Sequence, residues 1–193
     1  MALRQLTFLG NPVLRARAGE ATDLSNPKLL SLAGDMAETM LANNGVGLAA
    51  PQIGVGTRLI VFRIPPERAE QEGGGEVLPI HILINPEITP LDAAMEAGLE
   101  GCLSLPGLRG MVPRYTHIGY RGYDVAGRLI EREAHGFHAR VVQHEVDHLD
   151  GIMYLDRMAD FTTLQHESEI IRRIRREAKE WDDEETTEKP DET

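Results

Sequence analysis

The sequence predicts an α+β fold in which mixed or antiparallel β-sheets surround a central helix, with a further helix near the C-terminus. Two observations support this class: strand-like segments are grouped between helical ones, and they do not alternate with helices as in a parallel α/β sheet. At 193 residues the chain can bury a substantial single core. We expect one folded domain over residues 1–181 and a disordered acidic tail over residues 182–193.

The first elements are an N-terminal arm and a helix. Residues 1–24 are rich in loop signals, including the turn pair Asn11-Pro12. A helix is expected from Ser25-Asn26-Pro27, because a polar cap followed by Pro is typical of a helix start. Apolar residues then repeat at helical spacing from Leu29 to Met40, and Asn43-Asn44-Gly45 ends the pattern.

The middle of the chain predicts strands joined by polar segments. Strands are expected at 58–64, 80–88 with an interruption at Asn85-Pro86, 97–105, 117–125 and 129–137. The last two flank Ala126-Gly127, which indicates a hairpin. Residues 45–52 are too small and Gly-rich for an ordinary helix or strand, and the polar residues 67–76 predict a surface loop.

Two more helices follow, at 136–149 and 162–181, and Asp150-Gly151 ends the first of them. The net charge of −11 is uneven, because residues 180–193 carry eight acidic side chains and one Lys. A single cysteine excludes an intramolecular disulfide framework and suits a reducing cytoplasm. No stretch approaches the roughly 20 apolar residues of a membrane span, so we expect no membrane partner. We also expect no DNA partner.

His144-Glu145-Val146-Asp147-His148 spells the metal-binding pattern H-E-x-x-H. On a helix His144 and His148 project from one face, and Glu145 can take a proton from a metal-bound water. Two incidental surface histidines are the alternative interpretation. Asp147 and Asp150 are candidates to orient the imidazoles, or are solvated carboxylates.

A catalytic metal of this kind needs a third protein ligand. The extended motif H-E-x-x-H-x-x-G-x-x-H matches through Gly151, but Tyr154 stands where its third His belongs, and neutral Tyr is a poor ligand. Cys102 is the better candidate for the third ligand. The alternative interpretation is that Cys102 is a small, buried, apolar side chain without a metal. Sulfur with two imidazoles suits Fe²⁺, Zn²⁺, Co²⁺ or Ni²⁺.

Three segments together resemble the signature motifs of the peptide deformylase family. They are GVGLAAPQ at 45–52, EGCLS at 100–104 and HEVDH at 144–148, which match G-x-G-x-A-A-x-Q, E-G-C-x-S and H-E-x-x-H. The resemblance extends over about residues 9–158. It implies metal-dependent removal of the formyl group from the N-terminal formylmethionine of newly made polypeptides, with release of formate. Because it begins near residue 9, we expect a bacterial-type cytoplasmic enzyme without an organellar transit peptide.

The resemblance also implies roles for the residues in these motifs. Cys102, His144 and His148 would hold one divalent metal ion. Fe²⁺ is the favoured ion, and Zn²⁺, Ni²⁺ and Co²⁺ are the alternatives. Glu145 would act as general base and then as general acid. The backbone N–H of Leu103 and the side-chain amide of Gln52 would stabilise the oxyanion.

Other residues are candidates for substrate binding. Gly45 and Gly47 would let their loop pass close to the substrate. Matching positions assign the methionine pocket to Val46, Phe137 and Val141, each of which is otherwise plain core.

Three arginines lie near this predicted site. Arg140 falls on the same stretch as the pocket residues and would make the pocket rim more polar. Arg109 either contacts the peptide backbone or forms a structural ion pair, and for Arg114 the ion pair is favoured.

The predicted C-terminal helix is basic between Arg172 and Lys179. Such a run is usually a solvated helix face; the alternative is transient docking on ribosomal RNA, which the acidic tail opposes electrostatically. We otherwise expect a monomer whose partners are nascent formylated polypeptides.

Two rival functions remain. A zincin-type metallopeptidase shares H-E-x-x-H but lacks a cysteine ligand, so Cys102→Ala would leave its metal in place. A metal-buffering or ribosome-associated binding protein with the same fold would typically lose a catalytic residue, whereas Glu145 and Gln52 are present here.

Overall fold

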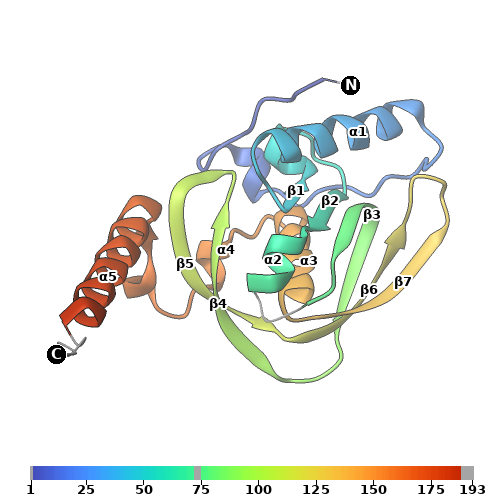
Figure 1. The fold of residues 1–193 in the computed structure, drawn as a ribbon. Coiled ribbons are helices and arrows are strands. Elements are labelled where there is room, and N and C mark those ends of the chain that lie inside the picture. The colour runs from blue at the N-terminus through green and yellow to red at the C-terminus, as the bar shows by residue number, and fades with distance from the viewer. Residues whose placement is uncertain (1, 72–74, 188–193) are drawn as a thin grey trace.

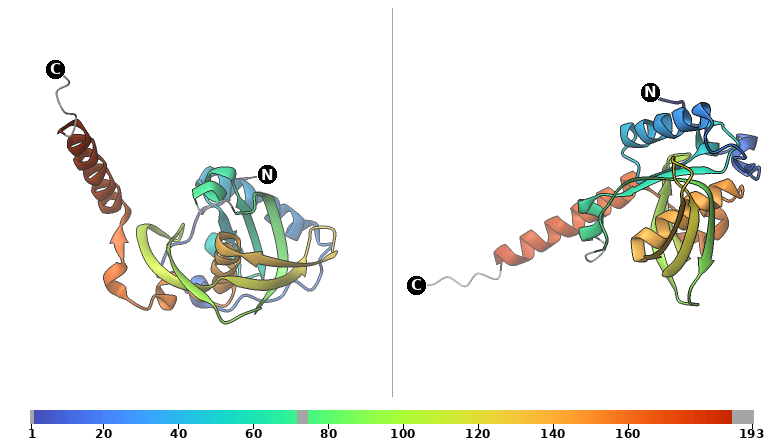
Figure 2. Two further views of the ribbon diagram at one scale, coloured as in Figure 1. Left: turned by 60° about the horizontal axis from the view of Figure 1, so that its bottom comes forward. Right: turned by 90° about the vertical axis from the view of Figure 1, so that its right-hand side faces the viewer.

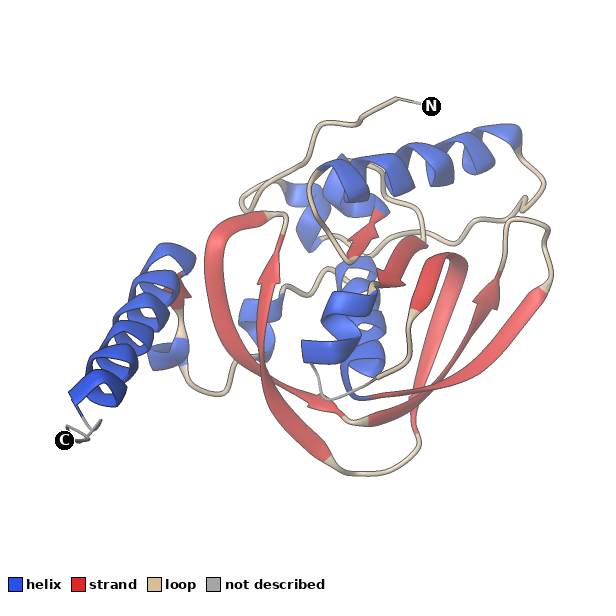
Figure 3. Cartoon of the chain, in the orientation of Figure 1, coloured by secondary structure: helices blue, strands red, loops and turns tan. Residues whose placement is uncertain are grey.

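The computed structural model describes residues 2–71 and 75–187, with side chains to residue 178. It has the predicted α+β architecture (Figure 3). Helix α3 (Gly136–Leu149) lies at the centre of the molecule, and the strands curve around it (Figure 1). This helix carries the H-E-x-x-H motif, so the motif is buried between layers rather than displayed on a surface helix.

The strands form two antiparallel sheets. The first has five strands in the order β1-β2-β3-β6-β7, and the second has three in the order β4-β5-β8. Their bounds are β1 (Gly47–Ala49), β2 (Leu59–Ile64), β3 (Leu78–Pro90), β4 (Met95–Cys102), β5 (Leu105–Tyr115), β6 (His117–Tyr123), β7 (Leu129–His135) and β8 (Gln165–His166).

The other helices lie outside the sheets. They are α1 (Pro27–Ala42), α2 (Pro66–Gln71), α4 (Tyr154–Arg157) and α5 (Glu167–Thr187), with 3-10 turns at Pro12–Arg15, Ala50–Ile53 and Phe161–Thr163. Helix α1 packs over β1 and β2, whereas α5 projects away from the body and packs against β5 and β8 (Figure 2). None of the described helices is long and apolar enough to cross a membrane.

Local signals explain the ends of α1 and α3. In α1, Asn26 accepts a hydrogen bond from the Lys28 N–H and Pro27 occupies the first turn, as predicted. Helix α3 ends at Asp150, and Gly151 follows with φ +74°. A Cβ at residue 151 would lie 2.6 Å from the Arg15 carbonyl oxygen, so only glycine fits both the conformation and the space.

The predicted interruption at Asn85-Pro86 takes the form of a bulge. β3 continues through it, but its pairing with β6 shifts register between Ile84 and Glu87, and Asn85 adopts φ +51°. The Asn85 side chain accepts from the Ala21 N–H and donates to the Ala21 carbonyl. The N-terminal arm therefore supplies the hydrogen-bond partners of the Asn85 side chain in the bulge. This is a long-range contact that the local sequence pattern does not reveal.

Four further differences lie in the loops and sheets. Residues 45–52 contain a short strand and a 3-10 turn, and 67–76 begins with α2, while residues 72–74 lie outside the described part. The strand predicted at 97–105 ends at Cys102, and β5 was not predicted at all. Two prolines and two glycines in β5 argue against a strand, yet its pairing with β4 is long and nearly regular.

The C-terminal helix begins later and ends later than predicted. Residues 161–166 form a 3-10 turn and β8, and α5 starts only at Glu167. It continues to Thr187, so residues 182–187 are helical where disorder was expected, and 188–193 lie outside the described residues. Residues 167–189 contain no Gly or Pro to end a helix. The lack of helix-breaking residues therefore counts for more here than the acidic composition, from which disorder was predicted.

Candidate metal centre and active site

The structure brings together the three predicted metal ligands. Cys102 is the last residue of β4, and His144 and His148 lie one turn apart on α3. All three are buried, and one ligand atom from each lies within 4.8 Å of the others. Cys102 Sγ is 3.2 Å from His148 Nε2. One thiolate and two imidazoles suit a borderline transition-metal ion with one position left open.

The charges of the site favour a deprotonated sulfur. Burial alone would raise the pKa of the Cys102 thiol, but the His148 and His144 imidazoles outweigh it and hold that pKa well below its usual range. Burial opposes the charged form of His144, yet hydrogen bonds with Cys102 and Glu100 raise its pKa well above the ordinary value. The pocket thus favours the thiolate form of Cys102, which is the form that binds a metal, whereas His144 must release its proton when an ion binds.

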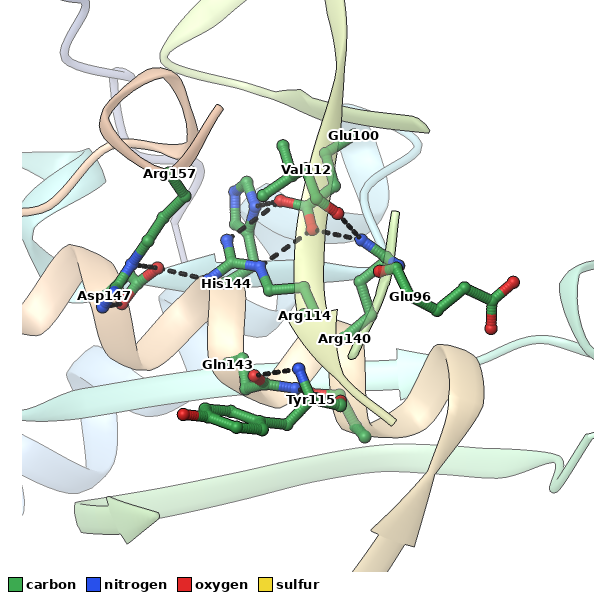
Figure 4. Close-up of polar contacts among 11 residues, drawn as sticks. Glu96, Glu100, Val112, Arg114, Tyr115, Arg140, Gln143, His144, Asp147 and Arg157 are labelled. Carbon is green, nitrogen blue, oxygen red and sulfur yellow. Dashed lines mark hydrogen bonds and ion pairs between the residues drawn. The ribbon is translucent and has the colours of Figure 1, made fainter. Parts of the chain in front are cut away.

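Glu100 orients His144 from β4 (Figure 4). One of its oxygens lies 2.9 Å from His144 Nδ1 and 3.0 Å from Arg114 Nη2. The other accepts from Arg114 Nε and Arg140 Nη1, both at 2.9 Å. Donation from Nδ1 to the carboxylate directs Nε2 of His144 towards the metal position.

Arg140 holds Glu100 from the side opposite His144 (Figure 4). Its guanidinium also donates to the carbonyls of Val112 at 2.7 Å and Glu96 at 2.8 Å, joining β5 to β4. A Cβ at Gly98 would lie 2.6 Å from the Arg140 guanidinium carbon, so this glycine leaves the space that the arginine occupies. The guanidinium thus serves Glu100, where the sequence predicted a polar pocket rim.

Asp147 and Asp150 do not orient the imidazoles. Asp147 pairs with Arg114 and, at 2.7 Å, with Arg157, while Asp150 pairs with Arg58 at 2.7 Å. Arg114 is therefore a buried structural ion-pair residue, as favoured from the sequence. It links the carboxylate of the central helix to Glu100 and so to His144.

Glu145 lies beside the metal ligands with an unsatisfied carboxylate oxygen. Among the described residues, three buried side-chain polar atoms lack a hydrogen-bond partner: Glu145 Oε2, His148 Nδ1 and the Tyr154 hydroxyl. Atoms of this kind usually indicate an ion, water or ligand. Burial, partly offset by the two histidines, raises the pKa of Glu145 to about 7. A carboxyl with that pKa exchanges protons near neutrality.

Gly47 makes room for Glu145. A Cβ at residue 47 would lie 2.2 Å from Glu145 Oε1 and 2.6 Å from its Cδ. The sequence assigned this glycine to a close approach of the substrate. The protein group that a side chain at residue 47 would meet is the Glu145 carboxylate, and Gly45 faces Met40 and Leu103.

Gln52 and Leu103 flank the cysteine. The Gln52 amide nitrogen is 3.3 Å from Cys102 Sγ and 3.3 Å from Ser104 Oγ, and its oxygen accepts from the Ala49 N–H at 2.8 Å. These contacts fix which end of the amide faces the site. Leu103 follows the sulfur ligand directly, in the turn between β4 and β5.

The three candidate pocket residues share one apolar cluster. Val141 is buried in it, and Val46 and Phe137 are half-buried at its edge. The Arg68 guanidinium of α2 lies 4.6 Å from the centre of the Phe137 ring. Helix α2, which the sequence did not predict, therefore borders the group of residues assigned to the substrate.

Arg109 and Tyr154 have structural contacts. Arg109 is 3.2 Å from Glu167 at the start of α5, and its guanidinium lies over Gly101, where a Cβ would collide with it. The Tyr154 ring stacks against the His144 imidazole at 6.2 Å between centroids. Tyr154 thus packs beside a ligand from the position where a zincin would supply its third histidine.

Sequence reasoning missed the support of Glu100 by Arg114 and Arg140. The only signal available was a Glu two residues before the cysteine. Its partners are 14, 40 and 44 residues away along the chain, so no local spacing connects them.

Comparison with known proteins covers most of the chain. The sequence profile of the family described as polypeptide deformylase matches residues 3–163. The chain is 54% identical over 154 residues to Peptide deformylase 2 of Bordetella bronchiseptica, covering 80% of this chain and 86% of that protein. It is 49% identical over 158 residues to Peptide deformylase 1 of Nitrosomonas europaea, covering 82% and 89%.

Solved structures agree with these matches. The fold is similar to the Met-Ala-Ser-bound class I type b peptide deformylase from Acinetobacter baumannii, with TM-score 0.74 and 34% identity over 81% of this chain and 99% of that one. The Thermotoga maritima peptide deformylase gives the same score and identity over 83% and 100%. The family match ends at Thr163, before β8 and α5.

Proposed function

Since the chain belongs to the polypeptide deformylase family, we propose that it performs the family's reaction with one divalent metal ion held by Cys102, His144 and His148. It is a hydrolase that removes the formyl group from the N-terminal methionine of polypeptides. The observation that carries the proposal is the buried group of three ligand atoms beside the unpartnered oxygen of Glu145.

When bound by Cys102, His144 and His148, the metal would supply Lewis acidity, which would make water a stronger nucleophile and the formyl group a better electrophile. We propose Fe²⁺ as the native ion, with Zn²⁺, Ni²⁺ or Co²⁺ able to replace it, because one soft sulfur and two imidazoles accept all four. Glu100 keeps His144 in the required tautomer and orientation.

Glu145 moves the proton in this proposal. Its Oε2 is buried and unpaired, so it can accept a proton from the attacking water and later deliver it to the leaving amine. The pKa of about 7 suits both directions of transfer near neutral pH. Gly47 leaves the space that the carboxylate occupies, because a side chain at residue 47 would collide with it.

Gln52 and Leu103 stabilise the charge that develops on the formyl oxygen. The Gln52 amide is fixed by Ala49 so that its NH₂ group faces the cysteine. The Leu103 backbone N–H follows the sulfur ligand on the chain. A donor of this kind typically contributes a factor of about 10²–10³ to the rate.

The substrate methionine binds beside Val46, Phe137 and Val141, whose shared apolar cluster suits an unbranched thioether side chain. Gly45 and Gly47 keep the neighbouring loop free of side chains. Arg109 contacts the peptide backbone from β5, where its side chain is one-third exposed and paired with Glu167. A Met-Ala-Ser peptide occupies the related structure from Acinetobacter baumannii.

The substrates are nascent formylated polypeptides, and we propose a cytoplasmic monomer that meets them as they are made. Transient contact with the ribosome through α5 follows from its row of arginines between residues 172 and 176, on an element that projects from the body (Figure 2). Binding of purified ribosomes that weakens with salt, and with Arg172→Glu and Arg175→Glu together, tests this contact.

The function is tested by formate release from a formyl-Met peptide under anaerobic conditions. Release should stop when the metal is stripped and return when Fe²⁺ is restored. The Cys102→Ala variant should retain no metal at this site and release no formate. Release by metal-free protein, or an active Cys102→Ala variant, would refute the proposed centre.

A further inference from the structure

A second group of metal-binding side chains lies on the outer face of the five-stranded sheet. His117 of β6 and His135 of β7 are directly paired across the hairpin. Their imidazole rings stack with centroids 3.9 Å apart and an interplanar angle of 17°. Glu133 is two residues before His135, so its side chain points to the same face of β7.

Carboxylates approach His117 from two segments. Glu133 Oε2 lies 3.1 Å from Nε2, and Asp92, from the connection between β3 and β4, places Oδ2 3.4 Å from Nδ1. One ligand atom each from His117, Glu133 and His135 lies within 4.8 Å of the other two. The Glu133 side chain is 68% exposed, so rotation about its side-chain bonds can bring it closer without repacking the core.

We propose that His117, Glu133 and His135 form a second divalent-cation site, with Asp92 beside it, for an ion such as Zn²⁺, Ni²⁺ or Cu²⁺. Ligands at about 2.0–2.2 Å from one ion are about 3.3 Å apart in a tetrahedral arrangement, so the ligand atoms must approach by roughly 1.5 Å at most. One imidazole must also turn out of the stack, because the nitrogen lone pairs lie in the ring planes and two stacked rings do not point them at one ion. Imidazole and carboxylate suit these ions, and the absence of sulfur separates this chemistry from that of Cys102. A fourth position stays open to water.

The surroundings favour a cation. An open hollow of about 620 Å³ adjoins the group, and its lining includes the carboxylates of Glu87, Glu131 and Glu133. Arg121 pairs with Glu87 at 2.7 Å. Arg132 also lines the hollow, so its three carboxylates outnumber its two guanidiniums by one, and this net charge attracts a cation only weakly.

The position of the site gives the ion a structural consequence. His135 directly precedes α3, and the N–H of Gly136 donates to the Thr116 carbonyl. The N–H of Leu91 donates to the His117 carbonyl. An ion here joins the β3–β4 connection, the hairpin and the start of the helix that carries Phe137 and the catalytic histidines. The competing interpretation is that His117 contacts the two carboxylates directly and the group holds no metal.

The test is equilibrium dialysis of the metal-free full-length protein against buffered Zn²⁺, with bound zinc counted per chain. Wild-type protein should hold two equivalents, and His117→Gln and His135→Gln one each, with affinity for the second ion reduced at least about 10-fold. Glu133→Gln should lower the affinity for the second ion less than either histidine substitution does. The exposed His166→Gln variant is the matched control and should hold two.

Cys102→Ala separates this inference from the proposed function. If only the outer site binds, this variant and wild type both hold one equivalent, and the His117 variant holds none. A Co²⁺ titration adds a second readout, because the outer ion should add absorption without a thiolate charge-transfer band. Equal stoichiometry in wild type and both histidine variants, or an equal loss in His166→Gln, would overturn the outer site.

Discussion

The two groups of metal-binding side chains differ in what surrounds them. In the Cys102 group every ligand is buried. Glu100 contacts the ligand His144, and Arg114 and Arg140 hold Glu100 in turn. In the His117 group the imidazoles stand on a sheet surface, and their partners are exposed carboxylates. The first group is therefore preorganised before an ion binds, whereas the second must contract around its ion.

This difference separates catalysis from simple binding. A reacting centre must hold its groups within a fraction of an ångström, and that requires locked rotamers and satisfied supporting residues. An outer site without a general base has no such requirement. The buried group includes Glu145 with an unpaired oxygen, and the described residues of the exposed group include no counterpart.

The largest effect should come from Glu145→Gln. The variant keeps the size of the side chain and the fit against Gly47 but removes the proton acceptor. Formate release should fall by about 10²–10⁴-fold, while the metal content stays near wild type. Retained activity would refute the general-base role, and loss of the metal together with activity would assign Glu145 to the structure of the centre.

Gly47→Ala should come next. Its Cβ would lie 2.2 Å from Glu145 Oε1, so the carboxylate must move away from its present position. A displacement of about 1 Å can lower kcat by about 10²-fold, with metal content unchanged. The matched control is Gly56→Ala, because a Cβ at residue 56 meets no atom within 4 Å. Equal rates for the two variants would contradict the contact.

Glu100→Gln tests the support of His144. It weakens the hydrogen bond to Nδ1 and leaves Arg114 and Arg140 without their carboxylate. Affinity for the catalytic metal should fall by about 10–100-fold, measured by competition with a chelator. Glu133→Gln is the matched change in the exposed group and should leave this affinity unchanged. A similar loss in both variants would show that the effect is one of net charge.

The sequence predicted the ligands of the catalytic centre but not what holds them. Cys102, His144 and His148 belong to compact motifs, and both the central helix and the β6–β7 hairpin follow from local signals. The strand β5 was missed because its prolines and glycines are locally unfavourable, whereas its pairing with β4 and β8 is a tertiary contact that local spacing does not reveal. Asp147 was predicted either to orient an imidazole or to be a solvated carboxylate, whereas tertiary contacts give it two arginines.

The smallest effect should come from Arg140, which acts on the metal only through Glu100. In Arg140→Met the carboxylate keeps Arg114 and His144 but loses one donor, so the metal should dissociate faster by about 3–10-fold, less than after loss of Glu100. Gly98→Ala should produce the same change, because its Cβ would displace the guanidinium.

The two substitutions should not add. Once Met replaces Arg140, a methyl group at residue 98 has no guanidinium to displace, so the double variant should release its metal no faster than Arg140→Met alone. Additive rates would mean that each residue acts by its own route. If instead neither variant changes metal release, Arg114 alone is enough to hold Glu100, and Arg140 serves only to join β4 to β5 through the Glu96 and Val112 carbonyls.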